Sequence, residues 1–167
     1  MGITFADIQL TNSEDLTLLS KKYIKKKEVR TIQITALVDT GASMLTIPRS
    51  IQEKLGLPKV EEQNVELGNG SIITVDVVGP VEIRFENRVT ITTAVVLPDE
   101  IEVLLGAIPL QAMDVLIDVR RERLIVNPQS PDKARLYLHS TDKILSPEQL
   151  KELKVTGEDN SKENDKT

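Results

Sequence analysis

Apolar and polar positions alternate along much of the chain, and this spacing is typical of strands in a sheet with one buried face. The segments between them are rich in Gly, Pro, Asn or charged residues, which favour turns. The segments with strand character are 3–10, 29–38, 44–47, 60–67, 72–78, 81–85, 89–95, 103–106, 115–119 and 123–126, with 134–139 as a last candidate. The pattern therefore predicts an all-β fold.

The same alternation predicts which side chains are buried. In the first strand the candidate core residues are Phe5, Ile8 and Leu10. Farther along, two neighbouring strands are expected to form a hairpin with one buried face, composed of Val81, Ile83 and Phe85 from the first strand and Val89, Ile91, Thr93 and Val95 from the second.

Only short helices are expected. Pro48 opens one of them, because the missing N–H of proline costs nothing in a first turn. Ile51 and Leu55 are four residues apart and share one face of this helix, and Gly56 ends it.

Two more short helices are predicted, over 107–113 and from the start signal Ser146-Pro147 to Leu153. Residues 11–15 are polar and indicate a turn, whereas 16–24 fits more than one type of structure. Asn69 lies between two glycines, which strongly favours a tight hairpin turn.

The chain has 167 residues, enough for one domain with a sizeable core and a tail. We expect the domain to cover 1–140 and the tail 141–167, with the short helix first and a disordered polar segment from Thr156 to Thr167. Val, Ile and Leu are abundant, but there are only two Phe and two Tyr and no Trp, which suits a small sheet-rich protein.

Charge and composition exclude several classes of function. The formal net charge is −5, which argues against general nucleic-acid binding. There is no Cys, and His139 is the only His, so thiolate metal sites and nucleophile–histidine pairs are not expected. No segment has the length of a membrane span or the pattern of a signal peptide. The expectation is a cytoplasmic protein without membrane partner, metal or cofactor.

A basic cluster covers 21–27, in which five of the seven residues are Lys. It is interpreted either as a solvated loop or as a contact surface for an acidic partner.

The chemistry is predicted to centre on Asp39. The apolar residues before it suit a buried strand, and a carboxylate at the end of such a strand is costly unless it is hydrogen-bonded or does chemistry. Thr40 adds a hydroxyl group, and Gly41 allows a sharp turn and a close approach of a substrate. The alternative interpretation is an ordinary turn closed by an Asp side chain.

The chain resembles the retropepsin-like aspartic proteases in their short bacterial, single-domain form. The matching pieces lie in the expected order within 31–127, and they are Leu37-Val38-Asp39-Thr40-Gly41-Ala42-Ser43, the Pro48–Leu57 segment, the Gly68-Asn69-Gly70 hairpin and Leu104-Leu105-Gly106. The resemblance implies a small closed barrel with one or two short helices that works as a homodimer. It also implies an endopeptidase that hydrolyses peptide bonds with water activated between two Asp39 carboxylates, one from each subunit.

The resemblance assigns roles to individual residues. Asp39 would be the catalytic acid and base, Thr40 would form a hydrogen bond across the dimer, and the Gly41 N–H would support the carboxylate. The turn of Leu67, Gly68, Asn69, Gly70 and Ser71 would be the flap that closes over a peptide substrate. Val38, Ala42, Leu104 and Leu105 would line the subsites.

One position departs from the family. Many retropepsins have Arg followed by Asn or Asp after the second glycine, whereas this chain has Ala107-Ile108, so an ion pair that braces the dimer is absent. Residues 3–10 and 134–139 are the predicted interface segments. The departure motivates an alternative function, a non-cleaving peptide-binding or assembly module on the same fold. A third interpretation is an unrelated small β protein.

Overall fold

The computed structural model describes residues 2–138 and 145–153. The chain divides into two units, Met1–Arg135 and Leu136–Thr167, where the sequence predicts a division at residue 140. In the second unit the predicted helix is confirmed as α5 (Pro147–Glu152). Its start is capped reciprocally, because the Ser146 hydroxyl accepts a hydrogen bond from the Gln149 N–H and the Gln149 side chain accepts one from the Ser146 N–H.

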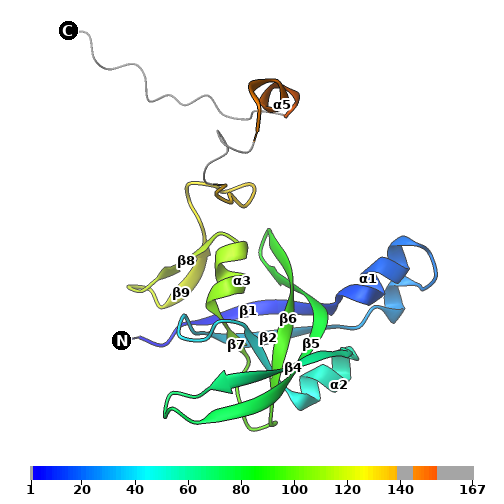
Figure 1. Ribbon diagram of the computed structural model, residues 1–167, viewed down its shortest axis with the longest axis vertical. Coiled ribbons are helices and arrows are strands. Elements are labelled where there is room, and N and C mark those ends of the chain that lie inside the picture. Colours follow the sequence, from blue (N-terminus) through cyan, green and yellow to red (C-terminus); the bar gives the residue numbers. More distant parts are fainter. Residues whose placement is uncertain (1, 139–144, 154–167) are drawn as a thin grey trace. The chain divides into compact units, whose positions relative to one another are not determined.

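The first unit is mostly β-sheet, as predicted (Figure 1). Its strands are β1 (Phe5–Asn12), β2 (Thr31–Val38), β3 (Leu45–Pro48), β4 (Lys59–Glu66), β5 (Ile72–Phe85), β6 (Arg88–Leu97), β7 (Leu104–Leu105), β8 (Val115–Asp118) and β9 (Arg123–Val126). They form one sheet in the order β4-β5-β6-β3-β7-β2-β1-β9-β8. Because β1 also pairs with β5, the strands from β5 to β1 form a closed circuit of pairings.

The main core consists mostly of Ile, Leu, Val and Ala side chains, together with Phe85 and Met113. Ile8 and Leu10 of β1 are buried as predicted, but the prediction for Phe5 is wrong, since this side chain is 45% exposed. The inward positions of β1 are the even-numbered ones, and Phe5 therefore faces outward.

The predicted buried face of the hairpin formed by β5 and β6 is also wrong in part. Val81, Ile83 and Phe85 are buried as predicted, and so is Val95, but Val89 and Ile91 are exposed. In the register of β5 with β6, Val81 lies opposite Thr92, Ile83 opposite Thr90 and Phe85 opposite Arg88. Directly opposed residues share a face, so the even-numbered residues of β6 accompany the buried face of β5.

Near the N-terminus a helix replaces the predicted turn. α1 (Ser13–Ser20) begins directly after Asn12, whose side-chain oxygen accepts hydrogen bonds from the N–H groups of Glu14 and Asp15. The polar run that indicated a turn is thus a helix cap. After a turn, a short 3-10 helix, η1 (Lys26–Glu28), leads into β2.

The two middle helices are confirmed as α2 (Arg49–Leu55) and α3 (Ala107–Ala112). Pro48 is the cap of α2 rather than its first residue, and Gly56 ends that helix in the left-handed conformation. None of the helices in the described part of the chain is long and apolar enough to cross a membrane.

The strand predicted over 134–139 is wrong for 134–138, where no strand forms and Leu136, Tyr137 and Leu138 are exposed. Hydrophobic alternation alone does not make a strand where no partner strand pairs with it. His139 and the segment Thr156–Thr167 lie outside the described residues.

Candidate active site

Asp39 follows the last residue of β2 and begins the loop that leads to β3. The Asp39 N–H donates a hydrogen bond to the carbonyl oxygen of Leu105 (3.1 Å), and the carbonyl oxygen of Asp39 accepts one from the Ala42 N–H (3.2 Å). The Gly41 N–H donates to the Oδ1 atom of Asp39 (2.9 Å). The carboxylate is therefore held in one orientation, in a side chain that is half-buried.

Strand β7 fixes the loop from one side. It pairs in parallel with β2, with Leu37 opposite Leu104 and Val38 opposite Leu105. The Leu37 N–H also donates to the carbonyl oxygen of Val103 (2.8 Å). This pairing brings together the two glycine-containing segments that are far apart in the sequence.

The first turn of α3 fixes the loop from the other side. The Ala107 N–H donates to the carbonyl oxygen of Ala42 (2.8 Å), and the Ile108 N–H donates to that of Ser43 (2.9 Å). The first N–H groups of a helix have no partner within the helix, and here the Asp39 loop supplies it. The loop and the helix therefore support each other.

Gly106, between β7 and α3, ends the matching segment Leu104-Leu105-Gly106 but was assigned no role in the site from the sequence. A Cβ atom at this position would lie 2.4 Å from the carbonyl oxygen of Met44 and 2.8 Å from that of Ala42. Both contacts are with backbone, which cannot move aside as a side chain does. The feature of the sequence that could have identified Gly106 as a site residue is the apolar run 103–105 directly before it.

The predicted subsite residues differ in exposure. Val38, Ala42 and Leu104 are half-buried next to the loop, whereas Leu105 is fully buried in the main core. The Thr40 hydroxyl forms no hydrogen bond within the described part of the chain. It is exposed and available to a group from outside the chain.

The predicted flap is a hairpin turn between β4 and β5. The Leu67 N–H donates to the carbonyl oxygen of Ser71, and the Gly70 N–H donates to that of Leu67 (both 2.8 Å). Gly70 has a φ of +83°, a value that glycine adopts without strain. Every residue of the turn, from Leu67 through Gly68 and Asn69 to Ser71, is exposed.

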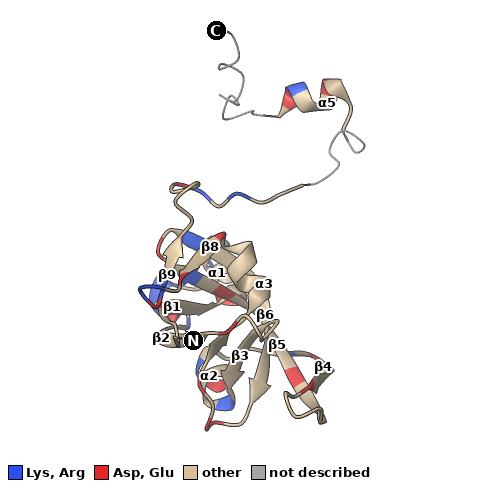
Figure 2. Ribbon diagram, turned by 90° about the vertical axis from the view of Figure 1, so that its left-hand side faces the viewer, with Lys and Arg blue, Asp and Glu red and all other residues tan. Residues whose placement is uncertain are grey.

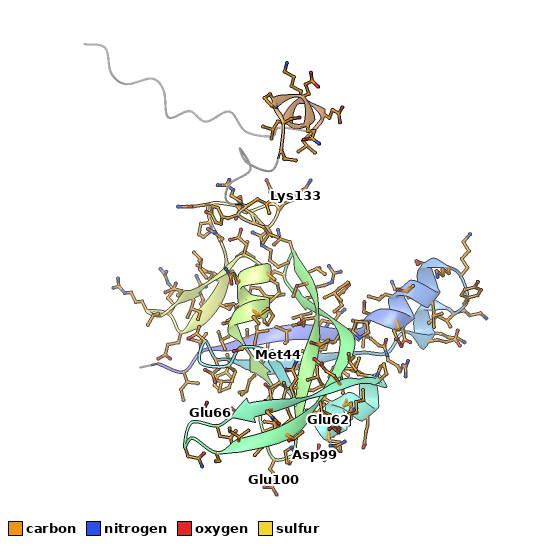
Figure 3. All side chains as sticks on the ribbon, in the orientation of Figure 1. Met44, Glu62, Glu66, Asp99, Glu100 and Lys133 are labelled. Atoms are coloured by element: carbon orange, nitrogen blue, oxygen red, sulfur yellow. The ribbon has the colours of Figure 1, made fainter. Side chains whose placement is uncertain are left out.

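No strand pairing or hydrogen bond among the described residues joins this turn to the Asp39 loop. The link between them is Met44, labelled in Figure 3, which packs against a second apolar cluster. That cluster contains Val75 and Val77 of β5 and Val95 of β6. The end of the Asp39 loop thus contacts an apolar cluster to which β5, a strand of the hairpin, contributes.

A pocket of about 510 Å³ lies beside β5 of the same hairpin. Its lining residues are Arg49, Ile73, Thr74, Val75, Asp76, Val96, Leu97, Pro98 and Asp99. Asp76 forms ion pairs with Lys59 (2.9 Å) and Arg49 (3.9 Å). The carboxylates of Glu62 and Asp76 raise the pKa of Lys59, because they favour its charged form.

The Asp39 side chain forms no ion pair in the described part of the chain, and its only hydrogen bond there comes from Gly41. Residues 2–138 and 145–153 also contain no group of three or more His, Asp or Glu side chains arranged to hold a metal ion. The chain thus presents a single oriented carboxylate next to an exposed hydroxyl.

Residues 27–107 match the model of a protein family described as aspartyl protease, which belongs to the retropepsin-like clan. The match begins just before β2 and ends at the first residue of α3, so it contains Asp39, the hairpin turn and Gly106. The segment is thus similar to the aspartyl protease family, and the resemblance predicted from the sequence is confirmed. A search of curated proteins found no match.

Proposed function

We propose that the protein is an aspartic endopeptidase that is active as a homodimer. The observation that carries the proposal is the Asp39 loop, in which one carboxylate is oriented by the Gly41 N–H and braced by β7 and α3. The family match supports a protease in general, and the geometry of the loop supports the specific mechanism described next.

The aspartic-protease mechanism, which hydrolyses a peptide bond without a covalent intermediate, uses two carboxyl groups. Two adjacent carboxylates cannot both ionise easily, so they share one proton. The ionised one then removes a proton from water, and the protonated one donates to the carbonyl oxygen of the peptide. Since each chain presents one such carboxylate, the second Asp39 comes from a second copy of the chain.

In the dimer, the exposed Thr40 hydroxyl groups would form hydrogen bonds across the two-fold axis and fix the two loops against each other. The 67–71 turn would close over an extended peptide, whose main chain pairs with the protein backbone. The half-buried side chains of Val38, Ala42 and Leu104 would contact the substrate, and Leu105 would support them from the core.

The surface for the second subunit would begin at α3 and not at the predicted segments 3–10 and 134–139, because β1 is paired with strands of its own chain and 134–138 forms no strand. The Ile108 side chain is 55% exposed, and its N–H is hydrogen-bonded to the Asp39 loop. Leu116 on β8, the end strand of the sheet, is also exposed. An exposed strand edge with apolar side chains nearby is a surface on which two copies can pair.

The alternative function is a non-cleaving peptide-binding or assembly module on the same fold. The observation that favours it is Ile108 itself, because an apolar side chain stands where many retropepsins have a charged or amide residue that braces the dimer. This module would keep the hairpin and the subsites but would not hold two carboxyl groups within hydrogen-bonding distance of each other.

The test is incubation of the purified protein with a diverse peptide pool between about pH 4 and pH 7, where a carboxylate pair titrates. Asp39→Asn is the test variant, and Asp132→Asn, on an exposed segment, is the matched control. We expect cleavage by the wild type and the control only, and a dimer in sedimentation. A dimer that cleaves nothing favours the binding module, and equal cleavage by all three proteins refutes the catalytic role of Asp39.

A further inference from the structure

We propose that the turn between α1 and β2 is a docking element for membrane surfaces that carry anionic lipids. The turn comprises residues 21–27, and we call it the lysine turn; it contains Lys21, Lys22, Lys25, Lys26 and Lys27. The inference is independent of the proposed protease function. It departs from the expectation of no membrane partner, because a protein can bind a membrane surface without a spanning helix.

The charge of the lysine turn is concentrated and unpaired. Five of the 21 Lys and Arg residues of the chain lie within these seven positions, although the net charge of the chain is −5. All five lysines are exposed, and none forms an ion pair within the described residues. On α2, by contrast, basic and acidic residues lie side by side (Figure 2).

The lysine turn has a defined conformation. The N–H groups of Lys21, Lys22 and Tyr23 donate to carbonyl oxygens of the last turn of α1 at 2.9–3.1 Å. At the other end, Arg30 holds the turn to α1 through two hydrogen bonds of its guanidinium group to Asp15 (2.8 and 2.7 Å). Like charges are therefore held close together, although their repulsion opposes this arrangement.

Apolar side chains are exposed on the lysine turn and on the adjoining helix α1. Tyr23 is 76% exposed in the middle of the lysines, and Leu18, on α1, is 38% exposed. Tyr and Lys together suit the membrane interface, because the ring enters the headgroup layer while the ammonium groups contact lipid phosphates. A purely electrostatic partner gives no reason for an exposed aromatic side chain at this place.

The position of the lysine turn favours a membrane surface over a nucleic acid as the binding partner. α1 and the turn extend beyond the ends of β1 and β2, and the turn lies at the margin of the first unit (Figure 1). A flat membrane can contact such a projection while the acidic remainder stays away from the anionic lipids. A nucleic acid would need a longer basic track, because its affinity comes from many phosphate contacts.

The test is co-sedimentation of the full chain with vesicles of phosphatidylcholine alone and of phosphatidylcholine mixed with phosphatidylserine. We expect binding only to the anionic vesicles, and weaker binding as the salt concentration rises. Each lysine near the surface strengthens partition about fivefold, so Lys26→Gln/Lys27→Gln is expected to weaken it by roughly tenfold or more. Lys54→Gln/Lys133→Gln changes the net charge equally at exposed sites elsewhere and serves as the control (Lys133 is labelled in Figure 3).

A second variant separates the contributions of charge and apolar contact. Tyr23→Ser keeps the charge and is expected to weaken vesicle binding severalfold, which a solvated loop would not show. Equal binding by the two double variants overturns the proposal, as does equal binding to neutral and anionic vesicles. Fluorescence anisotropy with a single-stranded oligonucleotide completes the test, since tighter binding to it than to vesicles identifies a nucleic acid as the partner and refutes the membrane.

Discussion

The substitution Gly106→Ala tests how tightly the Asp39 loop is held. The new Cβ atom would lie 2.4 Å from the Met44 carbonyl oxygen and 2.8 Å from both the Ala42 carbonyl oxygen and the Met44 nitrogen. The shortest of these distances is about 1 Å less than an ordinary van der Waals contact. Because Gly106 has a φ of −83°, alanine meets no backbone strain there, and the whole effect is steric.

The magnitude follows from what must move to relieve the overlap. Overpacking costs about 1–3 kcal/mol when side chains can adjust, and here three backbone atoms are in the way, so the upper end applies. Displacing the loop also weakens the hydrogen bonds of Ala107 to Ala42 and of Ile108 to Ser43, each of which contributes about 1 kcal/mol. The free energy of unfolding is therefore expected to fall by about 3–4 kcal/mol, or the Tm by about 10 °C.

Urea unfolding followed by circular dichroism measures this loss, and Gly68→Ala is the matched control. No heavy atom lies within 4 Å of a Cβ atom at Gly68, so this change is expected to leave stability unaltered or to raise it slightly. If both alanine variants unfold at the same urea concentration, the close packing of the loop against residue 106 is refuted. The measurement does not depend on whether the protein is a protease.

Two further predictions concern charged groups outside the site. Arg30→Ala removes the ion-pair partner of Asp15, whose side chain is 5% exposed, so the free energy of unfolding is expected to fall by about 3 kcal/mol. The exposed control Lys27→Ala is expected to lower it by less than about 0.5 kcal/mol. Urea unfolding measures both changes. Hydrogen bonds from Ser130, Asn127 and the Arg135 N–H lower the pKa of Asp114 from 3.8 to about 2. The ionised Asp114 side chain therefore makes its full contribution to stability at pH values above its unfolded-state pKa. As the pH falls from about 5 towards 2, about 2 kcal/mol of that contribution is lost. The urea midpoint of Asp114→Asn is expected to fall less steeply over that range than the wild-type midpoint, and parallel curves would contradict the role of Asp114.

Local patterns in the sequence were sufficient for most elements of the first unit. Alternating residues predicted β2 and the buried face of β5, because a strand repeats every two residues and needs no information from elsewhere. Gly56 and the glycines around Asn69 predicted a helix end and a hairpin turn, since their backbone requirements are local. The Asp39 loop was recognised for the same reason, from an apolar strand that ends in an acidic residue and a glycine.

Elements whose local sequence fits more than one type of structure were predicted less well. The polar run before α1 suits both a turn and a helix cap, and the choice depends on Asn12. That buried side chain caps α1 and also donates to the carbonyl oxygen of Leu55, 43 residues away, at 2.8 Å. The outward position of Val89 and the inward position of Arg88 were likewise set by the register of β6 with β5.

The sequence by itself thus determined most of the strands, the hairpin turn around Asn69 and the identity of the carboxylate at the centre of the candidate site. Only the tertiary structure decided what holds that carboxylate in place. β7 pairs with β2 although more than 60 residues separate them along the chain, and Gly106 then has space for a hydrogen atom and no more. The reason is physical: backbone conformation is chosen locally, whereas close contact between distant segments exists only once the sheet has brought them together.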